Sequence, residues 1–471
     1  MTKKYNSSAI LASLLICAFV GFFSETSLNI ALTILMEVFQ VKASTAQWLT
    51  TGYLLTLGII MPFTGLLIQM FTTRKLFFIS TTSLAMGTLL GALSVNFEML
   101  MFARILQAAG MGLLLPLMFN TVLVIFPMEK RGAAMGTIGL VLSFAPALGP
   151  ALSGILIQFM SWRFIFWLLL PFVLIGMFFA YKNLENVTEV KKQRIDLISA
   201  VLSTVGFGSI VYGFGQAGES WTNPIVITSI VIGLISLAFF VKRQNTEEPV
   251  LNLNVFKYPV FVMGLILVLV CMLVLMSTMI ILPIYLQTGA GLSVLVTGLM
   301  LLPGSAVNGA LQMVSGRIFD KYGHKVLVMP GLIIMMISLF FLTTLTPNSS
   351  IGLIVALHMI LMGSMAVVWT GAQTHALNQL PPELYAHGSA SLNTLLQVNG
   401  AIGTAVAISI LTSGMNNYLA HSSHPKQLSE ISNAIASGAN NVFWSLMIVA
   451  IIGFIISLFM NRTKISPTVN E

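Results

Sequence analysis

The sequence predicts an all-α integral membrane protein in which fourteen helices cross the bilayer. Of its 471 residues, 57% are hydrophobic and only 8% are charged, and the mean hydropathy is +0.95. Soluble domains usually carry about 25% charged residues. The apolar residues also form runs of about 20, which is the length that a helix needs to cross the hydrocarbon core. An even number of such runs places both chain ends on the same side.

The apolar runs follow one another with mostly short polar connections. The first run is too long for the apolar core of a cleaved signal peptide, so we interpret it as the first spanning helix. We expect spans at residues 9–35, 48–70, 76–95, 99–126, 132–159, 162–182, 197–217, 223–241, 259–286, 293–315, 326–345, 351–378, 388–412 and 441–461.

The basic residues provide a test of this topology, because short cytoplasmic loops are rich in Lys and Arg. With the N-terminus inside, eighteen basic residues fall on the cytoplasmic side, and only Lys42, Arg163 and Lys426 fall on the other. The net charge of +8 is spread singly or in small groups between apolar runs. It therefore reflects topology rather than a nucleic-acid-binding surface. We expect a multi-pass protein of the cytoplasmic membrane with both termini in the cytoplasm.

Two longer polar stretches divide the chain. They follow the sixth and eighth expected spans, at residues 183–196 and 242–258. We therefore predict an N-terminal six-helix bundle (1–182), two additional spans with flanking cytoplasmic linkers (183–258), and a C-terminal six-helix bundle with a short cytoplasmic tail (259–471). The start of the fifth span, RGAAMG at residues 131–136, is echoed at the thirteenth by HGSASL at residues 387–392. Two six-helix repeats with a substrate site between them are a known transporter plan.

One acid and one base lie clearly within the expected spans. Glu25 is predicted to lie about 10–15 Å and Arg104 about 8–11 Å below the outer surface, given the rise of a helix. A charged group in hydrocarbon is costly unless it is paired or hydrated, so such residues usually face the bundle interior and serve function. We expect Glu25 and Arg104 to meet. Alternatively, Glu25 reaches the headgroups, or Arg104 extends outward and never meets it.

Several polar residues within the spans are candidates for lining a substrate cavity. For each one, a hydrogen bond between helices is an equally good explanation. His358 roughly mirrors Arg104 in the second half, and a packed histidine is the alternative to a second proton site. The 28 Met and 31 Phe residues would suit a loose apolar cavity. The candidates are Asn29, Tyr53, Gln107, Asn120, Asn308, Gln312, His358, Trp369, Gln373, Asn393 and Gln397.

Other protein classes find little support. The spans offer no second acid near Glu25 and no His/Asp constellation, and the chain has no Gly-Lys-Ser/Thr loop to cradle the phosphates of ATP. Cys17 and Cys271 lie in apolar runs, where they behave as small hydrophobes. We therefore expect no catalytic residues, no metal and no cofactor.

Several stretches resemble motifs of the fourteen-span drug/proton antiporter branch of the major facilitator superfamily. Residues 143–167, SFAPALGPALSGILIQFMSWRFIFW, are similar to its antiporter motif in the fifth helix. Gly149, Pro150, Gly154, Trp162 and Arg163 match, whereas residues 145 and 153 stand where glycine is more usual. FSETSLNIAL at residues 23–32 looks like the first-helix motif, with Glu in place of the usual Asp.

The resemblance extends over nearly the whole chain. Residues 103–112, ARILQAAGMG, look like the helix-four motif, and residues 388–407 look like helix thirteen of this branch. SGRIFDKYGHK, residues 315–325, is similar to the superfamily's short cytoplasmic loop motif. The first-half copy, GLLIQMFTTRK at residues 65–75, has Gln69 at the usual Asp and Thr72 at the usual Gly. The resemblance implies a cytoplasmic gate at Arg317, Asp320 and Lys321, in which Asp320 carries the closed-inside contacts by itself.

The resemblance implies the major facilitator fold and proton-coupled efflux of lipophilic drugs by alternating access. Burial favours a neutral carboxyl and a nearby guanidinium favours the carboxylate, so protons and cargo would compete for Glu25. The expected partners are protons, the lipid bilayer and a lipophilic small molecule; cationic, neutral and, at Arg104, anionic cargo are all compatible. We expect a monomer. The alternatives are a dedicated exporter of a native metabolite or lipid, and a membrane sensor that does not transport.

Overall fold

The computed structural model describes residues 6–41, 43–46, 48–187, 190, 196–217, 221–244, 249–422, 425 and 427–460, and this part of the chain contains helices and no strands. A helix lies in every one of the expected ranges. Among the described residues, twelve helices are long and apolar enough to cross a membrane. The prediction of an all-α membrane protein is therefore confirmed.

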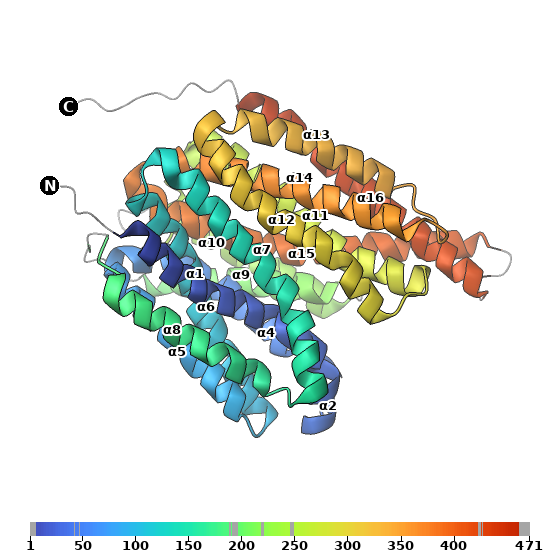
Figure 1. The fold of residues 1–471 in the computed structure, drawn as a ribbon, viewed down its shortest axis with the longest axis horizontal. Helices are drawn as coiled ribbons and strands as arrows, with labels where there is room; N and C mark the ends of the chain where they lie inside the picture. Colours follow the sequence, from blue (N-terminus) through green and yellow to red (C-terminus); the bar gives the residue numbers. More distant parts are fainter. Residues whose placement is uncertain are drawn as a thin grey trace. The chain divides into compact units, whose positions relative to one another are not determined.

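The first half of the chain forms α1 to α8, and α9 and α10 follow in the ranges predicted for the two additional spans (Figure 1). A 3₁₀ turn, Leu28–Ala31, separates α1 from α2. The bounds are α1 Ser7–Ser27, α2 Leu32–Phe39, α3 Ala43–Ala46, α4 Trp48–Met70, α5 Thr73–Leu93, α6 Phe97–Ile125, α7 Met128–Phe159, α8 Phe164–Asn183, α9 Leu197–Ala217 and α10 Pro224–Arg243.

The second half forms α11 to α16, after a 3₁₀ turn at Leu253–Lys257. A π-helical turn, Tyr285–Gly289, follows α11, and a 3₁₀ turn, Pro382–Leu384, precedes α15. The bounds are α11 Pro259–Ile284, α12 Val294–Tyr322, α13 Lys325–Leu342, α14 Ile351–Asn378, α15 Tyr385–Ala420 and α16 Leu428–Met460.

The helices begin where short polar side chains satisfy free backbone amides. The side chain of Asn96 accepts from the amide of Met99 at the start of α6, and Ser293 accepts from Val296 at the start of α12. Thr72 caps α5 in the same way. The first four amides of a helix have no partner within the helix, so each cap fixes where its helix starts.

The first expected span is not one regular α-helix. The α-helix ends at Ser27, two residues after Glu25, and the chain continues through the 3₁₀ turn into α2. The backbone hydrogen-bonding pattern changes from i→i−4 toward i→i−3 at such a turn, which leaves carbonyl groups near the junction available to other donors. The break therefore creates polar backbone next to the one acid that lies within the expected spans.

The chain divides into two compact units. Unit 1 comprises residues 1–127, 140–253 and 382–398; unit 2 comprises residues 128–139, 254–381 and 399–471. The start of α7 thus groups with the second half of the chain, and the start of α15 groups with the first. The three-part division drawn from the sequence stays a prediction.

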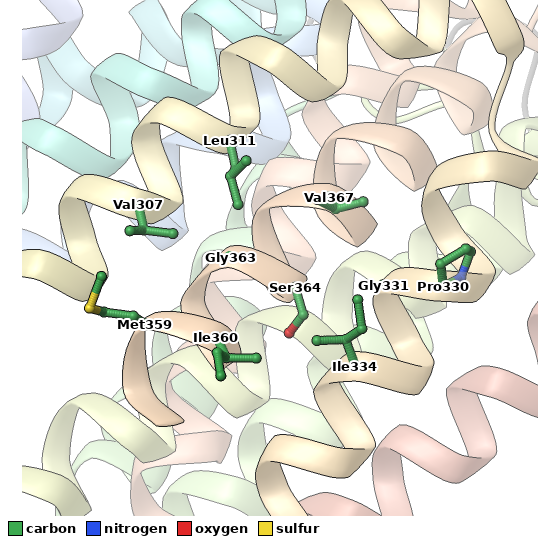
Figure 2. Close-up of a pocket in the computed structure, with 10 residues that line it drawn as sticks. All are labelled: Val307, Leu311, Pro330, Gly331, Ile334, Met359, Ile360, Gly363, Ser364 and Val367. Atoms are coloured by element: carbon green, nitrogen blue, oxygen red, sulfur yellow. The ribbon is translucent and has the colours of Figure 1, made fainter. Parts of the chain in front are cut away.

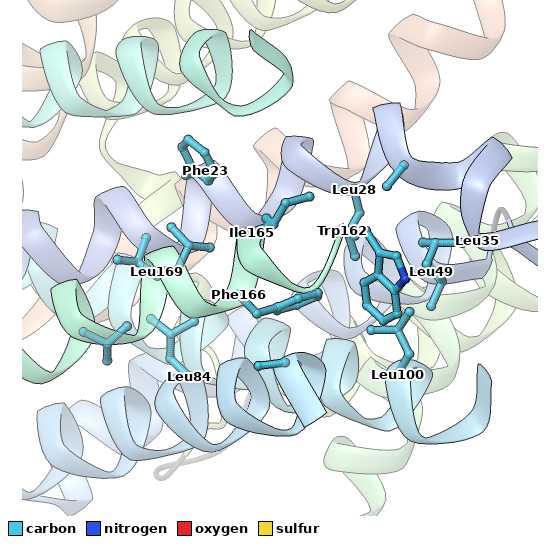
Figure 3. Close-up of a cluster of buried hydrophobic side chains, with 14 of the residues drawn as sticks. Phe23, Leu28, Leu35, Leu49, Leu84, Leu100, Trp162, Ile165, Phe166 and Leu169 are labelled. Carbon is cyan, nitrogen blue, oxygen red and sulfur yellow. The ribbon is translucent and has the colours of Figure 1, made fainter. Parts of the chain in front are cut away.

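A buried cluster in unit 1 packs α1, α2 and α8 against α4, α5 and α6. Phe23, Leu28, Leu49, Leu100 and Phe166 are at most 1% exposed and belong to this cluster (Figure 3). Burying a Leu or Phe side chain contributes about 1.5–3 kcal/mol relative to leaving it exposed to water. In a bilayer, close packing of such side chains also fixes the positions of the helices. The cluster holds the broken first span in place.

Candidate functional site

Glu25 lies in the last turn of α1, beside the break. The residue is half-buried, and its Oε2 atom is buried without a hydrogen-bond partner among the described residues. The neighbouring Thr26 donates its hydroxyl to the carbonyl of Pro146 on α7, at 3.1 Å. Glu25 therefore lies at a junction between helices, with one carboxyl oxygen available to bind a proton or to accept a hydrogen bond.

Arg104 is fully buried in α6 and binds the first span. Its Nη1 donates to the carbonyl and the hydroxyl of Ser24, both at 2.9 Å, and its Nε donates to the carbonyl of Leu49 on α4 at 3.2 Å. The guanidinium lies 4.2 Å from the ring centroid of Tyr53. A guanidinium presents several donors in one plane and stacks on aromatic rings, so one side chain can join three helices.

Gln107 extends this network one turn along α6. Its Oε1 accepts from Nη1 of Arg104 at 3.1 Å and from the hydroxyl of Ser24 at 3.0 Å. Its Nε2 donates to the hydroxyl of Thr88 on α5 at 3.0 Å. The hydroxyl of Tyr53 donates to the carbonyl of Gly21 at 3.1 Å. Two of the predicted cavity residues, Gln107 and Tyr53, thus lie together with Arg104.

The direct ion pair expected between Glu25 and Arg104 is absent from the described residues, in which Arg104 binds the backbone of α1 and α4 instead. The carbonyl groups at the break of α1 offer acceptors that a continuous helix would have used internally. The alternative in which Arg104 extends outward is also wrong, because its side chain is 0% exposed. Nη2 of Arg104 is buried and has no hydrogen-bond partner in the described part of the chain, and the same holds for Oε2 of Glu25.

Gly149 of the predicted antiporter motif lies against the same junction. A Cβ atom at this position would collide with the hydroxyl of Thr26 and crowd the carbonyl of Phe23. Glycine therefore allows α7 to approach α1 beside Glu25. Gly154 lies further along α7 and is half-buried. The side chains of Pro150 and Asn29 lie outside the described residues.

The other polar candidates of unit 1 do not join this network through any contact seen here. Asn120 is 3% exposed, and its Nδ2 atom lacks a hydrogen-bond partner within the described part of the chain. Asn393 donates to the carbonyl of Ser389 in its own helix at 2.8 Å. Gln397 is half-buried on α15. Their role as cavity residues stays a prediction.

The candidates of unit 2 form two local pairs. Nε2 of Gln312 donates to Oδ1 of Asn308 at 2.7 Å, and Nδ2 of Asn308 donates to the carbonyl of Met362 at 2.6 Å. Nε1 of Trp369 donates to Oε1 of Gln373 at 2.7 Å. Of these three bonds, the one from Asn308 to Met362 joins two helices, as the alternative expects, whereas the other two lie within α12 and within α14. Nε2 of Gln373 is buried and unpaired among the described groups.

His358 packs against the backbone of α12. A Cβ atom on Gly304 would collide with its imidazole ring, and its Nδ1 lacks a hydrogen-bond partner within the described residues. The side chain is 5% exposed. A buried imidazole whose Nδ1 has no partner among the described residues fits both a packed histidine and a proton site. The role of His358 as a second proton site therefore stays a prediction.

An apolar groove of about 390 Å³ lies between α12, α13 and α14 in unit 2. Val307 and Leu311 from α12 face Ile334 from α13 and Ile360 from α14, and Gly363 leaves room between them (Figure 2). The polar candidates named from the sequence are not among its lining residues. Sequence reasoning did not find this groove, because its residues have no polar signal that distinguishes them from lipid-facing ones.

Asp320 binds the backbone of α7 just after the first turn, within unit 2. Its carboxylate oxygens accept from the backbone amides of Gly132 and Ala133, at 2.7 and 2.8 Å, although α7 already begins at Met128. A carboxylate near the N-terminus of a helix is favoured by the helix dipole. Arg317 and Lys321 are exposed, and Nζ of Lys321 lies 5.1 Å from the ring centroid of Tyr322. Their role in a gate stays a prediction.

Glycines bring α7 and α12 together at this end of unit 2. Cβ atoms on Gly132 and Gly316 would each collide with the other's carbonyl oxygen, and one on Gly136 would collide with the carbonyl of Gln312. Arg131 also donates to Oδ1 of Asn378 on α14 at 3.1 Å. Sequence reasoning named Asp320 but not its amide partners. The repeated glycines of RGAAMG are the signal that could have found them.

The network also contains residues that the sequence did not single out. Ser24 and the carbonyl of Leu49 bind Arg104, and Thr88 binds Gln107. Serine and threonine are common in membrane helices and often bond to their own backbone, so their presence alone indicates little. The spacing of Arg104 and Gln107, one turn apart, is the signal that both face one neighbour.

Comparison with known proteins identifies the family to which this helical protein belongs. Residues 14–404 match the sequence profile of the Major Facilitator Superfamily. The chain belongs to this superfamily. Its fold is the major facilitator fold, and its members are transporters, so this protein is a multi-span membrane transporter and not an enzyme. The resemblance read from the motifs is confirmed.

Two similar members of the superfamily are named as drug-resistance proteins. The lincomycin resistance protein LmrB of Bacillus subtilis is 49% identical over 98% of both chains. LmrB of Listeria monocytogenes is also 49% identical over 98% of both chains. Among solved structures, the human organic anion transporter MFSD10 aligns with a TM-score of 0.68, covering 96% of this chain and 100% of that one. At 14% identity, this last likeness concerns the fold alone.

Proposed function

We propose that this transporter exports drugs across the cytoplasmic membrane in exchange for protons. The carrying observation is that two buried polar atoms near the break of α1, Oε2 of Glu25 and Nη2 of Arg104 on α6, have no hydrogen-bond partner within the described residues. Burying polar atoms without partners is costly, so such a pair is a candidate site for a group that comes and goes. A proton and a cargo molecule are two such groups.

The mechanism follows from competition at Glu25. When the carboxyl is ionised, it accepts a donor group of the cargo or the free Nη2 of Arg104; when it is protonated, that attraction is lost. If access to Glu25 alternates between the two sides, a proton from outside displaces cargo outward and its release inside restores the site. Mutually exclusive binding to two states couples the two fluxes.

The relatives suggest the first cargo to test. Both LmrB proteins are named for lincomycin resistance and match this chain over nearly its full length. We propose that lincomycin is among the exported compounds. The protein would act as a monomer with both termini in the cytoplasm. Arg317, Asp320 and Lys321 would belong to the gate on that side, of which Asp320 makes the visible contacts.

The polar side chains of both units would contact cargo during this cycle. In unit 1 these are Tyr53, Gln107, Asn120 and Gln397, together with Asn29. In unit 2 the unpaired Nε2 of Gln373 is the most direct candidate, because it is buried and its side chain is held by Trp369. The remaining candidates of unit 2 are Asn308, Gln312 and His358.

Replacing Glu25 tests the function. In a host that lacks its own drug pumps, the wild type is expected to raise the lincomycin concentration needed to stop growth. Glu25→Gln is expected to abolish this effect, and Glu25→Asp to retain part of it. In inverted vesicles, a proton gradient should drive lincomycin uptake by the wild type and not by Glu25→Gln.

A matched control is Glu98→Gln, because Glu98 is an exposed acid in the first turn of α6, the helix that also carries Arg104. This variant should behave as the wild type does. Full resistance and gradient-driven uptake in Glu25→Gln would show that the carboxyl does not couple the fluxes. Resistance without any response to the gradient would favour a transporter with another driving force.

A further inference from the structure

The two copies of the short cytoplasmic loop motif, at residues 65–75 and 315–325, differ from one another. In the sequence, Gly65 and Gln69 occupy the places that Gly316 and Asp320 occupy in the second copy. In unit 2, Asp320 holds the start of α7 through two backbone amides. Gln69 instead donates its Nε2 to the carbonyl of Glu383 at 3.4 Å, on the exposed edge of unit 1. One neutral, long hydrogen bond stands where the other copy has two short bonds to a carboxylate.

Unit 1 has a second contact at the same place. His387, in the first turn of α15, lies against Gly65 of α4, and its Nδ1 accepts from the backbone amide of Asn252 at 3.2 Å. The side chain is 3% exposed. Because Nδ1 accepts, the imidazole is neutral and carries its proton on Nε2. Residue 252 belongs to the segment that follows the two additional spans.

That segment is itself anchored to the two additional spans. The amide of Leu251 donates to Oε1 of Gln244 at 3.1 Å, and Nε2 of Gln244 donates to the hydroxyl of Ser199 on α9 at 3.1 Å. The hydroxyl of Ser199 donates to Asp196 at 2.7 Å, and Arg243 at the end of α10 binds the same carboxylate. A continuous chain of hydrogen bonds therefore leads from α9 and α10 to residue 251.

The carboxylate at the base of this chain stays ionised. The hydrogen bonds from the Arg243 guanidinium hold the pKa of Asp196 well below its usual range, and the Ser199 hydroxyl acts in the same direction. Asp196 therefore remains an acceptor throughout the physiological pH range. The chain of hydrogen bonds therefore does not depend, at its Asp196 end, on a group that titrates near neutral pH.

Apolar packing supports the same connection. Leu66 of α4, Phe207 of α9, Phe240 of α10, Leu251 and Ala390 of α15 belong to one buried cluster. Trp48 of α4 also stacks on Tyr212 of α9, with ring centroids 5.7 Å apart. The two additional spans thus lie on α4, and the segment after them reaches the start of α15 through both apolar contacts and hydrogen bonds.

We propose that the two additional spans fasten the start of α15 to α4 through residues 250–252 and His387, and that this strap replaces the carboxylate missing at Gln69. The proposal rests on the proposed transport function, because Gln69 belongs to the first-half copy of the motif that contains the proposed gate residue Asp320. The strap explains why the first copy of the motif functions with Gln69. It also gives the additional spans a task beyond occupying the bilayer.

Hydrogen exchange of the whole protein in lipid nanodiscs tests the strap. In His387→Leu, which removes the acceptor, the Asn252 amide and the start of α15 should exchange several-fold faster than in the wild type. In His387→Asn, whose Oδ1 can take the place of Nδ1, exchange should stay close to that of the wild type. His421→Leu, at the other end of α15, is the matched control and should change neither region.

A second-site change makes the test specific. Gln69→Asp added to His387→Leu should restore protection at the start of α15, because a carboxylate at position 69 could bind backbone amides there as Asp320 binds those of α7, but not at Asn252, which has lost its acceptor. Unchanged exchange at the start of α15 in His387→Leu would overturn the proposal. Failure of Gln69→Asp to restore that protection would overturn the replacement of the carboxylate.

If His387→Leu does not fold, Gln244→Leu provides the same test from the other end, because it removes the acceptor of the Leu251 amide. Faster exchange at the start of α15 supports the strap, and unchanged exchange contradicts it. These measurements need no substrate. A wild type that exports no lincomycin would therefore count against the proposed cargo, whereas the exchange data would still decide on the strap.

Discussion

Arg104 shows how one side chain can determine the geometry of a membrane site. It binds the carbonyls of Ser24 and Leu49 and lies over the ring of Tyr53, so it joins α6 to α1 and α4. Hydrogen bonds to charged groups contribute about 1.5–3 kcal/mol each, and a buried charge needs several of them. Arg104 is thus both a partner for Glu25 in the proposed cycle and a structural connection between three helices.

Arg104→Lys should lower thermal stability and abolish transport. Lysine lacks the planar fork and cannot reach both carbonyls and the ring, so at least one buried carbonyl should lose its partner at a cost of about 1–3 kcal/mol. The unfolding temperature in detergent measures the effect. Arg163→Lys is the control, because Arg163 is half-buried and its guanidinium donates to Ser94. An unchanged unfolding temperature in Arg104→Lys would contradict this structural role.

The sequence identified Glu25 and Arg104 because each is a lone charge in an apolar run, and that reasoning needs no structure. It did not find what Arg104 binds. The acceptors are backbone carbonyls, and the one at Ser24 is available because the α-helix ends at Ser27. Which carbonyls a helix end exposes depends on where neighbouring helices contact it, and this information is absent from residue types.

At the scale of elements, α7 and α12 approach one another through glycine. Gly132 and Gly316 meet backbone to backbone, and Asp320 accepts from the amide of Gly132 at the same contact. Small residues allow such contacts in membrane helices, where packing rather than the hydrophobic effect drives association. A contact of this kind has little tolerance for added volume.

Gly316→Ala should weaken the contact between α7 and α12. The new methyl group would collide with the carbonyl of Gly132, so the two backbones must separate, at a typical cost of about 1–3 kcal/mol. Faster hydrogen exchange of the Gly132 and Ala133 amides measures it. Gly298→Ala on the same helix meets open space and should leave these amides unchanged. Equal exchange in both variants would show that the contact tolerates a methyl group.

The ranges of the helices were largely predictable because apolar runs and caps such as Asn96 and Ser293 mark them directly. The break in the first span was not. Residues 23–32 contain no glycine or proline that would end an α-helix, and they turn instead where Thr26 binds the carbonyl of Pro146 and Gly149 lets α7 approach. A tertiary contact, rather than local propensity, decides the conformation there.

At the scale of the whole molecule, the alternation of spans and basic residues predicts which loops lie on which side. The loop between α5 and α6 should face outward, and the segment after α8 should face the cytoplasm. The fold class and the superfamily followed from composition and motifs, and the comparisons confirm both. The apolar groove between α12, α13 and α14 did not follow, because it depends on shape rather than on residue type.

Thiol labelling tests the topology. Val95→Cys should react with an impermeant maleimide in intact cells, and Glu185→Cys only in inverted vesicles, because the two positions lie on opposite sides in the predicted alternation. Cys17 and Cys271 are buried and should contribute little background. The reverse pattern would place the termini outside, and labelling of both positions from one side would show that the number of spans between them is not odd.

The hydrogen bonds of the segment that follows α10 would tolerate changes of sequence during evolution. The hydrogen bonds from Leu251 to Gln244 and from Asn252 to His387 come from main-chain amides. Every amino acid except proline supplies such an amide. These two hydrogen bonds therefore do not depend on which side chains stand at positions 251 and 252. A connection made in this way would leave no signature for a motif search, even among relatives that all possess it.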